Sequence, residues 1–160
     1  MTAIRGMCML CLIFFLYSIT ASAQSIDWLS LEDARNKASE NGKKVMLYFE
    51  ADWCQYCQKM NKEVFPKSPV IDSLHTYFYP VRIDIDSEEE VRFNGRNITE
   101  KSLAQKFRAL RTPTTIFMDA EGSVIGTQPG YLPVHIFTKL LSYVGSEAYG
   151  HTAFDEYLAE

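Results

Sequence analysis

The chain has 160 residues, of which 47% are hydrophobic and 13% aromatic, and its formal net charge is −4. This composition is typical of one globular domain with an apolar core, and it argues against a repetitive or disordered chain. The acidic balance provides neither the basic surface of a nucleic-acid-binding protein nor a polybasic membrane patch, so we expect no nucleic acid among the partners.

Residues 1–23 have the pattern of a secretory signal peptide. Arg5 precedes the apolar run GMCMLCLIFFLYSIT, and Ala21-Ser22-Ala23 supplies a small-residue cleavage site. Cleavage after Ala23 would leave residues 24–160 as the mature domain. The alternative is an uncleaved membrane anchor, although the apolar run is shorter than the roughly 20 residues that a membrane span requires.

The four cysteines form two C-x-x-C pairs, and only one pair is expected in the mature domain. Cys8 and Cys11 fall within the predicted signal peptide, whereas Cys54 and Cys57 remain. A disulfide between cysteines this close in sequence closes a very short loop and constrains little of the unfolded chain. In the oxidising compartment that export implies, we therefore expect the pair to have a chemical role.

The first elements expected in the mature domain are a helix and a buried strand. Ser30 can cap the helix, Asp33 occupies the capping-box position, and Asn41-Gly42 ends it. Residues 44–50, KVMLYFE, are almost continuously apolar, which is typical of a strand buried on both faces.

A second helix and a second strand are expected next. The apolar face of this helix is formed by Cys57, Met60, Val64 and Phe65. Pro66 ends or kinks the helix, and a further helical segment begins at Ser68. Residues 79–86 alternate between apolar and polar side chains, which predicts a strand.

The last third of the chain predicts a helix, a hairpin and a closing helix. The polar residues 87–97 predict only a connection. A helix over 99–110 starts near Thr99 or Glu100 and has one apolar face, formed by Leu103, Phe107 and Leu110. Two strands, at 114–119 and 123–128, flank the turn residues Ala120-Glu121-Gly122 and predict a hairpin. A helix over 132–144 follows, and the aromatic residues of the weakly periodic tail could dock on the domain.

This order of elements joins a βαβ unit to an antiparallel hairpin. We therefore predict an α/β fold in which helices flank both faces of one central mixed β-sheet.

Cys54 and Cys57 lie between a strand and a helix, at a spacing suited to thiol–disulfide exchange. Unpaired N–H groups and the dipole at the helix N-terminus favour the thiolate form of Cys54, which is the attacking form. Cys57 is one helical turn further and can resolve a mixed disulfide formed at Cys54. Trp53 would form an apolar rim beside Cys54, and the polar Gln55 argues that the pair is accessible.

A metal site is the competing interpretation of C-x-x-C. A structural zinc ion requires four ligands, yet His75, His135 and His151 all lie more than ten residues from Cys57. We therefore predict no zinc and no cofactor. Copper(I) can be held by two thiolates alone, so a copper(I) carrier remains an alternative.

The segments VMLYFEADWCQYC and RTPTTIFMDAEGSVIG resemble thioredoxin-fold proteins, in particular the SoxW-like periplasmic thioredoxins and the C-terminal domain of DsbD. The resemblance runs from about Trp28 to the C-terminus. It implies a thioredoxin fold with an extra N-terminal helix over residues 24–160. It also implies that Pro113 is cis and faces the cysteine pair, and that Thr112 presents its backbone to the substrate chain.

Two departures from the thioredoxin pattern affect the chemistry. Thioredoxins carry a buried Asp where Tyr48 stands here, and a Lys where Arg82 stands. Glu50 points to the same side of its strand as Tyr48 and could accept the proton of Cys57, or it could simply end the strand in solvent. The dipeptide Gln55-Tyr56 also differs from those of thioredoxin and of DsbA-like oxidases. It therefore does not indicate the redox potential of the cysteine pair.

The resemblance implies an exported, monomeric thiol–disulfide oxidoreductase of the bacterial periplasm. In this interpretation Cys54 and Cys57 reduce a disulfide-bonded client protein, and a membrane thiol donor of the DsbD or CcdA type returns the pair to its reduced state. A disulfide oxidase or isomerase remains the alternative within the same chemistry.

Overall fold

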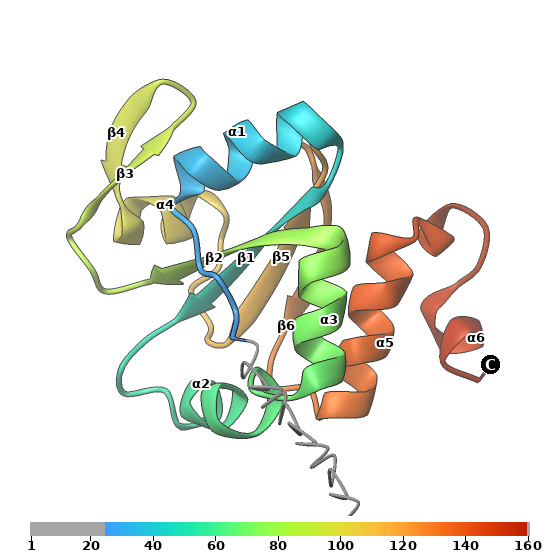
Figure 1. Cartoon of the computed structure of the whole chain (residues 1–160). Coiled ribbons are helices and arrows are strands. Elements are labelled where there is room, and N and C mark those ends of the chain that lie inside the picture. Colours follow the sequence, from blue (N-terminus) through green and yellow to red (C-terminus); the bar gives the residue numbers. More distant parts are fainter. Residues whose placement is uncertain (1–24, 160) are drawn as a thin grey trace, which may run out of the picture.

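The computed structural model describes residues 25–159 (Figure 1). The predicted signal peptide, its cleavage site after Ala23, and the pair Cys8 and Cys11 lie outside the described residues. Within 25–159, no helix has the length and apolar character needed to cross a membrane.

The predicted order of the main helices and strands is confirmed. The helical elements are α1 (Leu31–Asn41), α2 (Gln55–Lys59), the π-helical turn η1 (Met60–Val64), α3 (Ser68–Tyr77), α4 (Glu100–Lys106), α5 (Val134–Gly145), the 3-10 turn η2 (Ala148–Gly150) and α6 (Phe154–Ala159). The strands are β1 (Lys44–Glu50), β2 (Phe78–Asp84), β3 (Glu90–Phe93), β4 (Arg96–Thr99), β5 (Thr114–Met118) and β6 (Val124–Pro129).

The central sheet is mixed, as predicted, with the strand order β2-β1-β5-β6. β1 pairs with β2 in parallel and with β5 antiparallel, and β5 and β6 form the antiparallel hairpin. Helices α3 and α5 lie side by side against one face, and α1 and α4 cover the other (Figure 1). The α/β architecture with helices on both faces and an N-terminal helix is therefore confirmed.

Strand β1 is almost entirely apolar because both of its faces are buried. Val45, Leu47 and Phe49 belong to the core beneath α1 and α4, whereas Met46 and Tyr48 belong to the core beneath α3 and α5. Since successive side chains of a strand point to opposite faces, only a continuously apolar sequence can fill both cores. The C-terminal end of β1 leads into α2, which lies beyond this end of the sheet (Figure 1).

The caps of α1 follow the sequence prediction. The Ser30 hydroxyl accepts a hydrogen bond from the backbone N–H of Asp33 at 3.1 Å and donates to the Asp33 carboxylate at 2.8 Å. Gly42 ends the helix in the left-handed conformation, with φ of 78°. Glycine adopts this conformation without the steric cost that a Cβ atom adds.

The polar connection predicted over residues 87–97 is wrong. These residues contain the β3–β4 hairpin, whose two-residue turn is Asn94-Gly95, with both residues at positive φ. Asn-Gly is the favoured sequence for such a turn. The signal was hidden because polar residues predominate in this segment, but Val91, Phe93 and Ile98 pack against the core beneath α1 and α4.

Helix α4 is shorter than predicted. It ends at Lys106, and Arg108 adopts a positive φ of 55°, which a helix cannot continue through. Leu103 is buried and Phe107 partly buried, as expected, but Leu110 lies beyond the helix with 60% of its surface exposed. Leu110 therefore does not belong to the apolar face of α4.

The C-terminal tail docks on α5, as the sequence suggested. The rings of Tyr149, Phe154 and Tyr157 lie within 6.4 Å of the Tyr143 ring, and the Tyr143 hydroxyl donates a hydrogen bond to the Thr152 carbonyl at 2.7 Å. The aromatic residues of the tail thus share one contact point on α5.

Candidate active site

The two cysteines lie at the end of β1, where the chain turns into α2. Cys54 is the N-cap of α2, and its Sγ accepts a hydrogen bond from the backbone N–H of Cys57 at 3.1 Å. The pair forms a disulfide, and both residues are buried. The predicted placement of the first sulfur at the start of a helix is therefore observed, and the N–H that points at it would favour a thiolate there.

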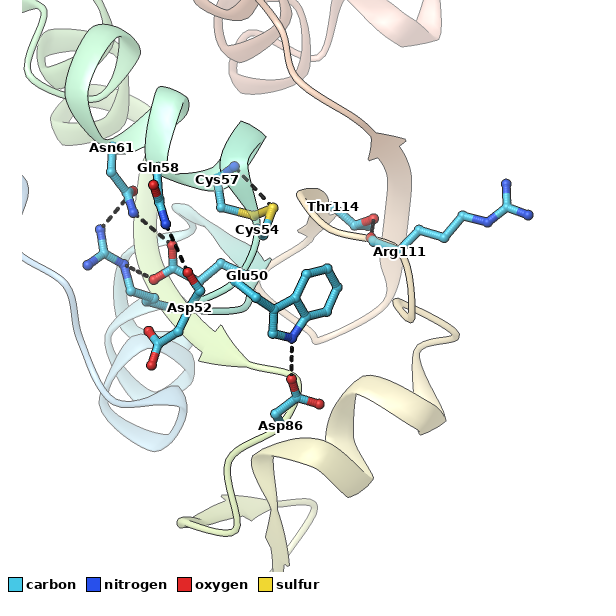
Figure 2. Close-up of a disulfide and its surroundings, with 11 residues drawn as sticks. Glu50, Asp52, Cys54, Cys57, Gln58, Asn61, Asp86, Arg111 and Thr114 are labelled. Carbon is cyan, nitrogen blue, oxygen red and sulfur yellow. Dashed lines mark hydrogen bonds and ion pairs between the residues drawn. A yellow bond between two sulfur atoms is a disulfide. The ribbon is translucent and has the colours of Figure 1, made fainter.

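The C-x-x-C segment carries two exposed aromatic side chains, one before Cys54 and one between the two cysteines. Trp53 is 66% exposed and Tyr56 is 62% exposed, and Gln55 between the cysteines is also exposed. The Trp53 indole N–H donates a hydrogen bond to the Asp86 carboxylate at 2.7 Å (Figure 2). Because Asp86 follows β2, this bond fixes the Trp53 ring to a second segment of the chain.

Thr114, at the start of β5, and the loop that precedes it lie beside the disulfide (Figure 2). The Thr112–Pro113 peptide bond is cis, and Pro113 is buried. The Pro113 carbonyl accepts a hydrogen bond from the Gly130 N–H at 2.7 Å, and the Thr114 hydroxyl donates to the Arg111 carbonyl at 2.6 Å. The Thr112 hydroxyl oxygen is buried and has no hydrogen-bond partner within residues 25–159.

Glu50 is held in a closed network of side chains. Its side chain is 15% exposed, and its two oxygens accept from Arg82 Nε at 3.1 Å and from Asn61 Nδ2 at 2.9 Å. Arg82 also donates to Asn61 Oδ1 at 3.3 Å. Glu50 is thus not a strand end in solvent. Figure 2 shows Glu50 and Asn61 together on the side of the disulfide opposite Arg111.

Asn61 is a site residue that the sequence reasoning missed. It follows Cys57 by four residues, so the two lie one helical turn apart on the same side of the α2–η1 helix. This i, i+4 spacing was the available signal, but a single Asn within a helix carries little information by itself. Asn61 becomes recognisable as a site residue only in the folded chain, where its side chain hydrogen bonds to Glu50 at the end of β1.

Tyr48 occupies the core beneath this network. Its ring packs against Trp28 and Phe65, with centroid distances of 6.2 and 4.8 Å. Its hydroxyl is buried without a hydrogen-bond partner among the described residues. Burial raises the pKa of Tyr48 far above its usual value, the Glu50 charge raises it further, and Arg82 lowers it. Tyr48 therefore stays protonated near neutral pH and cannot act as a base there.

The described part of the chain has no cluster of titratable side chains that would form a metal centre. Within residues 25–159, no group of three or more His, Cys, Asp or Glu side chains is placed to hold a metal ion. Among residues 25–159, the thiolates that could hold a copper(I) ion are those of Cys54 and Cys57.

Residues 31–145 match the family model described as a thioredoxin-like domain. The chain is 25% identical over 113 residues to the disulfide bond reductase DsbH of Chlamydia pneumoniae, covering 68% of each protein. It is 30% identical over 99 residues to the thiol:disulfide interchange protein DsbD of Pseudoalteromonas atlantica, covering 60% of this chain but only 15% of DsbD.

Among solved structures, the fold is similar to that of a thioredoxin-fold protein from Helicobacter pylori. The TM-score is 0.64 at 26% sequence identity, and the match covers 87% of this chain and 84% of the other.

Proposed function

This chain belongs to the thioredoxin-like domain family of thiol–disulfide oxidoreductases, and we propose that it is an exported reductase of protein disulfides. The observation that carries the proposal is the cysteine pair at the start of α2, with the Cys57 N–H 3.1 Å from Cys54 Sγ. Such a pair provides one thiol to attack a client disulfide and a second thiol to resolve the product.

The reaction proceeds in two exchanges. The Cys54 thiolate attacks one sulfur of the client disulfide, forming an S–S bond to it, and the other client sulfur leaves as a thiolate. Cys57 then loses its proton and attacks Cys54 Sγ, and the first client sulfur leaves. The client gains two electrons, and the protein ends as the Cys54–Cys57 disulfide. A thiol donor must then return two electrons to this disulfide.

We assign Glu50 the role of proton acceptor for Cys57. Burial disfavours the Cys57 thiolate, so a nearby base would speed the second exchange. Asn61 lies one helical turn from Cys57, and its side-chain amide donates a hydrogen bond to the Glu50 carboxylate. The carboxylate therefore contacts a residue on the same side of this helix as Cys57. Tyr48 is excluded because burial keeps it protonated.

Thr112 and Pro113 are assigned to client binding, and Trp53, Gln55 and Tyr56 to the rim around the sulfurs. The loop that contains the cis Thr112–Pro113 bond runs between Arg111 and Thr114 beside the disulfide (Figure 2), and Trp53 and Tyr56 of the C-x-x-C segment are exposed. A client chain that brings its sulfur to Cys54 would meet both segments.

The sequence pattern and the named relatives support export and a reducing direction. Residues 1–23 have the pattern of a signal peptide, and a bacterial periplasm is the destination we propose. One relative is named a disulfide bond reductase and another a thiol:disulfide interchange protein. Accordingly, we propose a protein client such as a sulfur-oxidation carrier or a cytochrome c apoprotein, and a membrane donor of the DsbD or CcdA type.

The proposal is tested by trapping clients and by following insulin reduction. Cys57→Ser should accumulate mixed disulfides through Cys54, because the resolving thiol is missing, whereas Cys54→Ser should trap little. The reduced wild-type protein should reduce insulin disulfides. Equal trapping by both variants, or no insulin reduction, would contradict the proposal. Stoichiometric copper(I) in reduced protein that cannot reduce insulin would favour the carrier alternative.

A further inference from the structure

The guanidinium of Arg82 contacts three side chains, and one of them comes from the segment before α1. Arg82 Nε lies 3.1 Å from a Glu50 carboxylate oxygen, and a terminal nitrogen donates to Asn61 Oδ1 at 3.3 Å. The third contact is with Trp28, whose ring centroid lies 4.3 Å from the guanidinium carbon. A guanidinium over an indole face is the strongest form of cation–π contact, because the ring of Trp has the most negative face. Arg82 thus connects Trp28 to the Glu50 carboxylate.

The Trp28 ring is itself fixed by the core and by the backbone next to it. It packs edge-on against Phe65 at a centroid distance of 5.2 Å and lies 6.2 Å from the Tyr48 ring. The backbone N–H of Leu29 donates to the Pro80 carbonyl at 2.9 Å, which holds this segment against β2. The indole therefore provides a fixed surface for a side chain that stacks on it.

Arg82 needs such a surface because its own side chain is open to solvent. It is 40% exposed, whereas Glu50 is 15% exposed. A long exposed side chain loses conformational freedom when it forms an ion pair, so such pairs are weak unless something else orders them. Stacking on Trp28 supplies that order. The Glu50 carboxylate is then held toward Asn61, which lies one helical turn from Cys57 (Figure 2).

We infer that Trp28 is a positioning residue for the second exchange. Its ring holds Arg82, and Arg82 holds the Glu50 carboxylate in the orientation in which it accepts the proton of Cys57. Trp28 takes part in no bond that forms or breaks and acts only through these two side chains. This inference rests on the proposed role of Glu50 and adds to it a residue far from the C-x-x-C segment in the sequence.

A peptide disulfide separates the two exchanges. The probe is a short cysteine peptide whose thiol is bonded to thionitrobenzoate. Attack by Cys54 on the peptide sulfur releases coloured thionitrobenzoate, because this acidic aromatic thiol is the better leaving group. Attack by Cys57 on Cys54 Sγ then releases the peptide thiol. Acid quenching followed by mass spectrometry measures how fast the mixed disulfide at Cys54 decays in this second exchange.

Trp28→Leu should slow the second exchange roughly two- to fivefold, the change in rate that corresponds to the loss of an exposed cation–π contact. The first exchange should keep its rate, because it needs no base for Cys57. Trp28→Phe retains an aromatic face and should keep most of the wild-type rate.

Tyr79→Leu is the matched control. Tyr79 also carries a stacked cation, since Lys43 Nζ lies 5.4 Å from its ring centroid. It pairs with Val45 near the start of β1, whereas the cysteines follow the end of that strand. Removing this second cation–π contact should change neither exchange.

A double-mutant cycle shows whether Trp28 acts through Glu50. In the Glu50→Gln background, Trp28→Leu should cause no further slowing of the second exchange, because the base that the ring positions is already gone. Equal slowing in both backgrounds would overturn the inference and leave the proposed function intact. An unchanged or faster second exchange in Trp28→Leu alone would overturn it as well.

Arg82→Lys replaces Trp28→Leu in the cycle if circular dichroism shows that the latter does not fold. Lysine keeps the charge but lacks the planar face and the paired donors of the guanidinium. It should slow the second exchange in the wild-type background and have no effect in Glu50→Gln, and any other result overturns the inference. If Glu50→Gln itself turns over at the wild-type rate, the inference fails together with the role of Glu50. If the wild-type protein releases no thionitrobenzoate, the proposed function fails.

Discussion

Replacing Glu50 by Gln removes a base and keeps the shape of the side chain. In the proposed reaction the carboxylate accepts the proton of Cys57, so Glu50→Gln should slow the second exchange and leave the first attack by Cys54 unchanged. General-base catalysis contributes about 10²- to 10⁴-fold in typical enzymes, and water can partly substitute. We therefore expect the second exchange to slow by roughly tenfold or more near neutral pH.

The stability cost of this substitution follows from the two bonds that Glu50 accepts. In Glu50→Gln the side-chain amide oxygen would still accept the hydrogen bond from Asn61. The ion pair with Arg82, whose Nε lies 3.1 Å from a Glu50 carboxylate oxygen, would be lost. Hydrogen bonds to charged groups contribute about 1.5–3 kcal/mol, and exposed ion pairs about 0–1 kcal/mol. Because Arg82 is 40% exposed, we expect a loss of about 1 kcal/mol. A domain of ordinary stability remains folded after such a loss.

Stopped-flow mixing of reduced protein with a thionitrobenzoate-labelled peptide, followed by acid quenching and mass spectrometry, separates the two exchanges. In Glu50→Gln the mixed disulfide at Cys54 should accumulate to a higher level than in the wild type. Tyr48→Phe is the control, because it changes the same strand face without removing a base. A variant that turns over at the wild-type rate from pH 6 to 9 would refute the role of Glu50.

Three further predictions concern stability and export. Tyr48→Phe removes a buried hydroxyl without a partner in the described residues and should stabilise the protein by about 1 kcal/mol in urea unfolding; a destabilised variant would mean that the hydroxyl is satisfied. Burial raises the pKa of Glu100, and the hydrogen bond that its carboxylate accepts from the Asp84 N–H at 3.0 Å lowers it. The folded state therefore favours the protonated form, and the stability contributed by Glu100 is lost as pH rises through its folded pKa. Glu100→Gln keeps an acceptor for that N–H, so it should be more stable than wild type above this pH, by less than about 1 kcal/mol, and equal to it well below; a constant difference from pH 3 to 8 would contradict this. Exported protein should begin at Gln24 by mass spectrometry, and a folded exported species that retains Met1 would refute cleavage.

Most of the sheet and the cysteine pair could be predicted because their signals are local. An apolar strand, a C-x-x-C segment and a helix follow one another directly, and each is specified by neighbouring residues. The same holds for the cap residues Ser30 and Gly42, whose roles depend on a few adjacent positions.

The missed features depend on contacts between distant segments. The β3–β4 hairpin carries polar residues on its open side, so its apolar residues become informative only once they meet the core beneath α1. Leu110 was assigned to a helix because its spacing fitted, but Arg108 turns the backbone out of the helix first. The network of Glu50, Asn61 and Arg82 combines three elements that only the folded chain brings together.

The reduction potential of the Cys54–Cys57 couple tests the central claim most directly. It is measured by equilibrating the protein with thiol buffers of known potential and quantifying the oxidised fraction. A reductase of client disulfides should have a potential below about −200 mV, in the range of glutaredoxins and of thioredoxin at about −270 mV. A potential near −120 mV, as in the strong oxidant DsbA, would contradict the assignment of a reducing role.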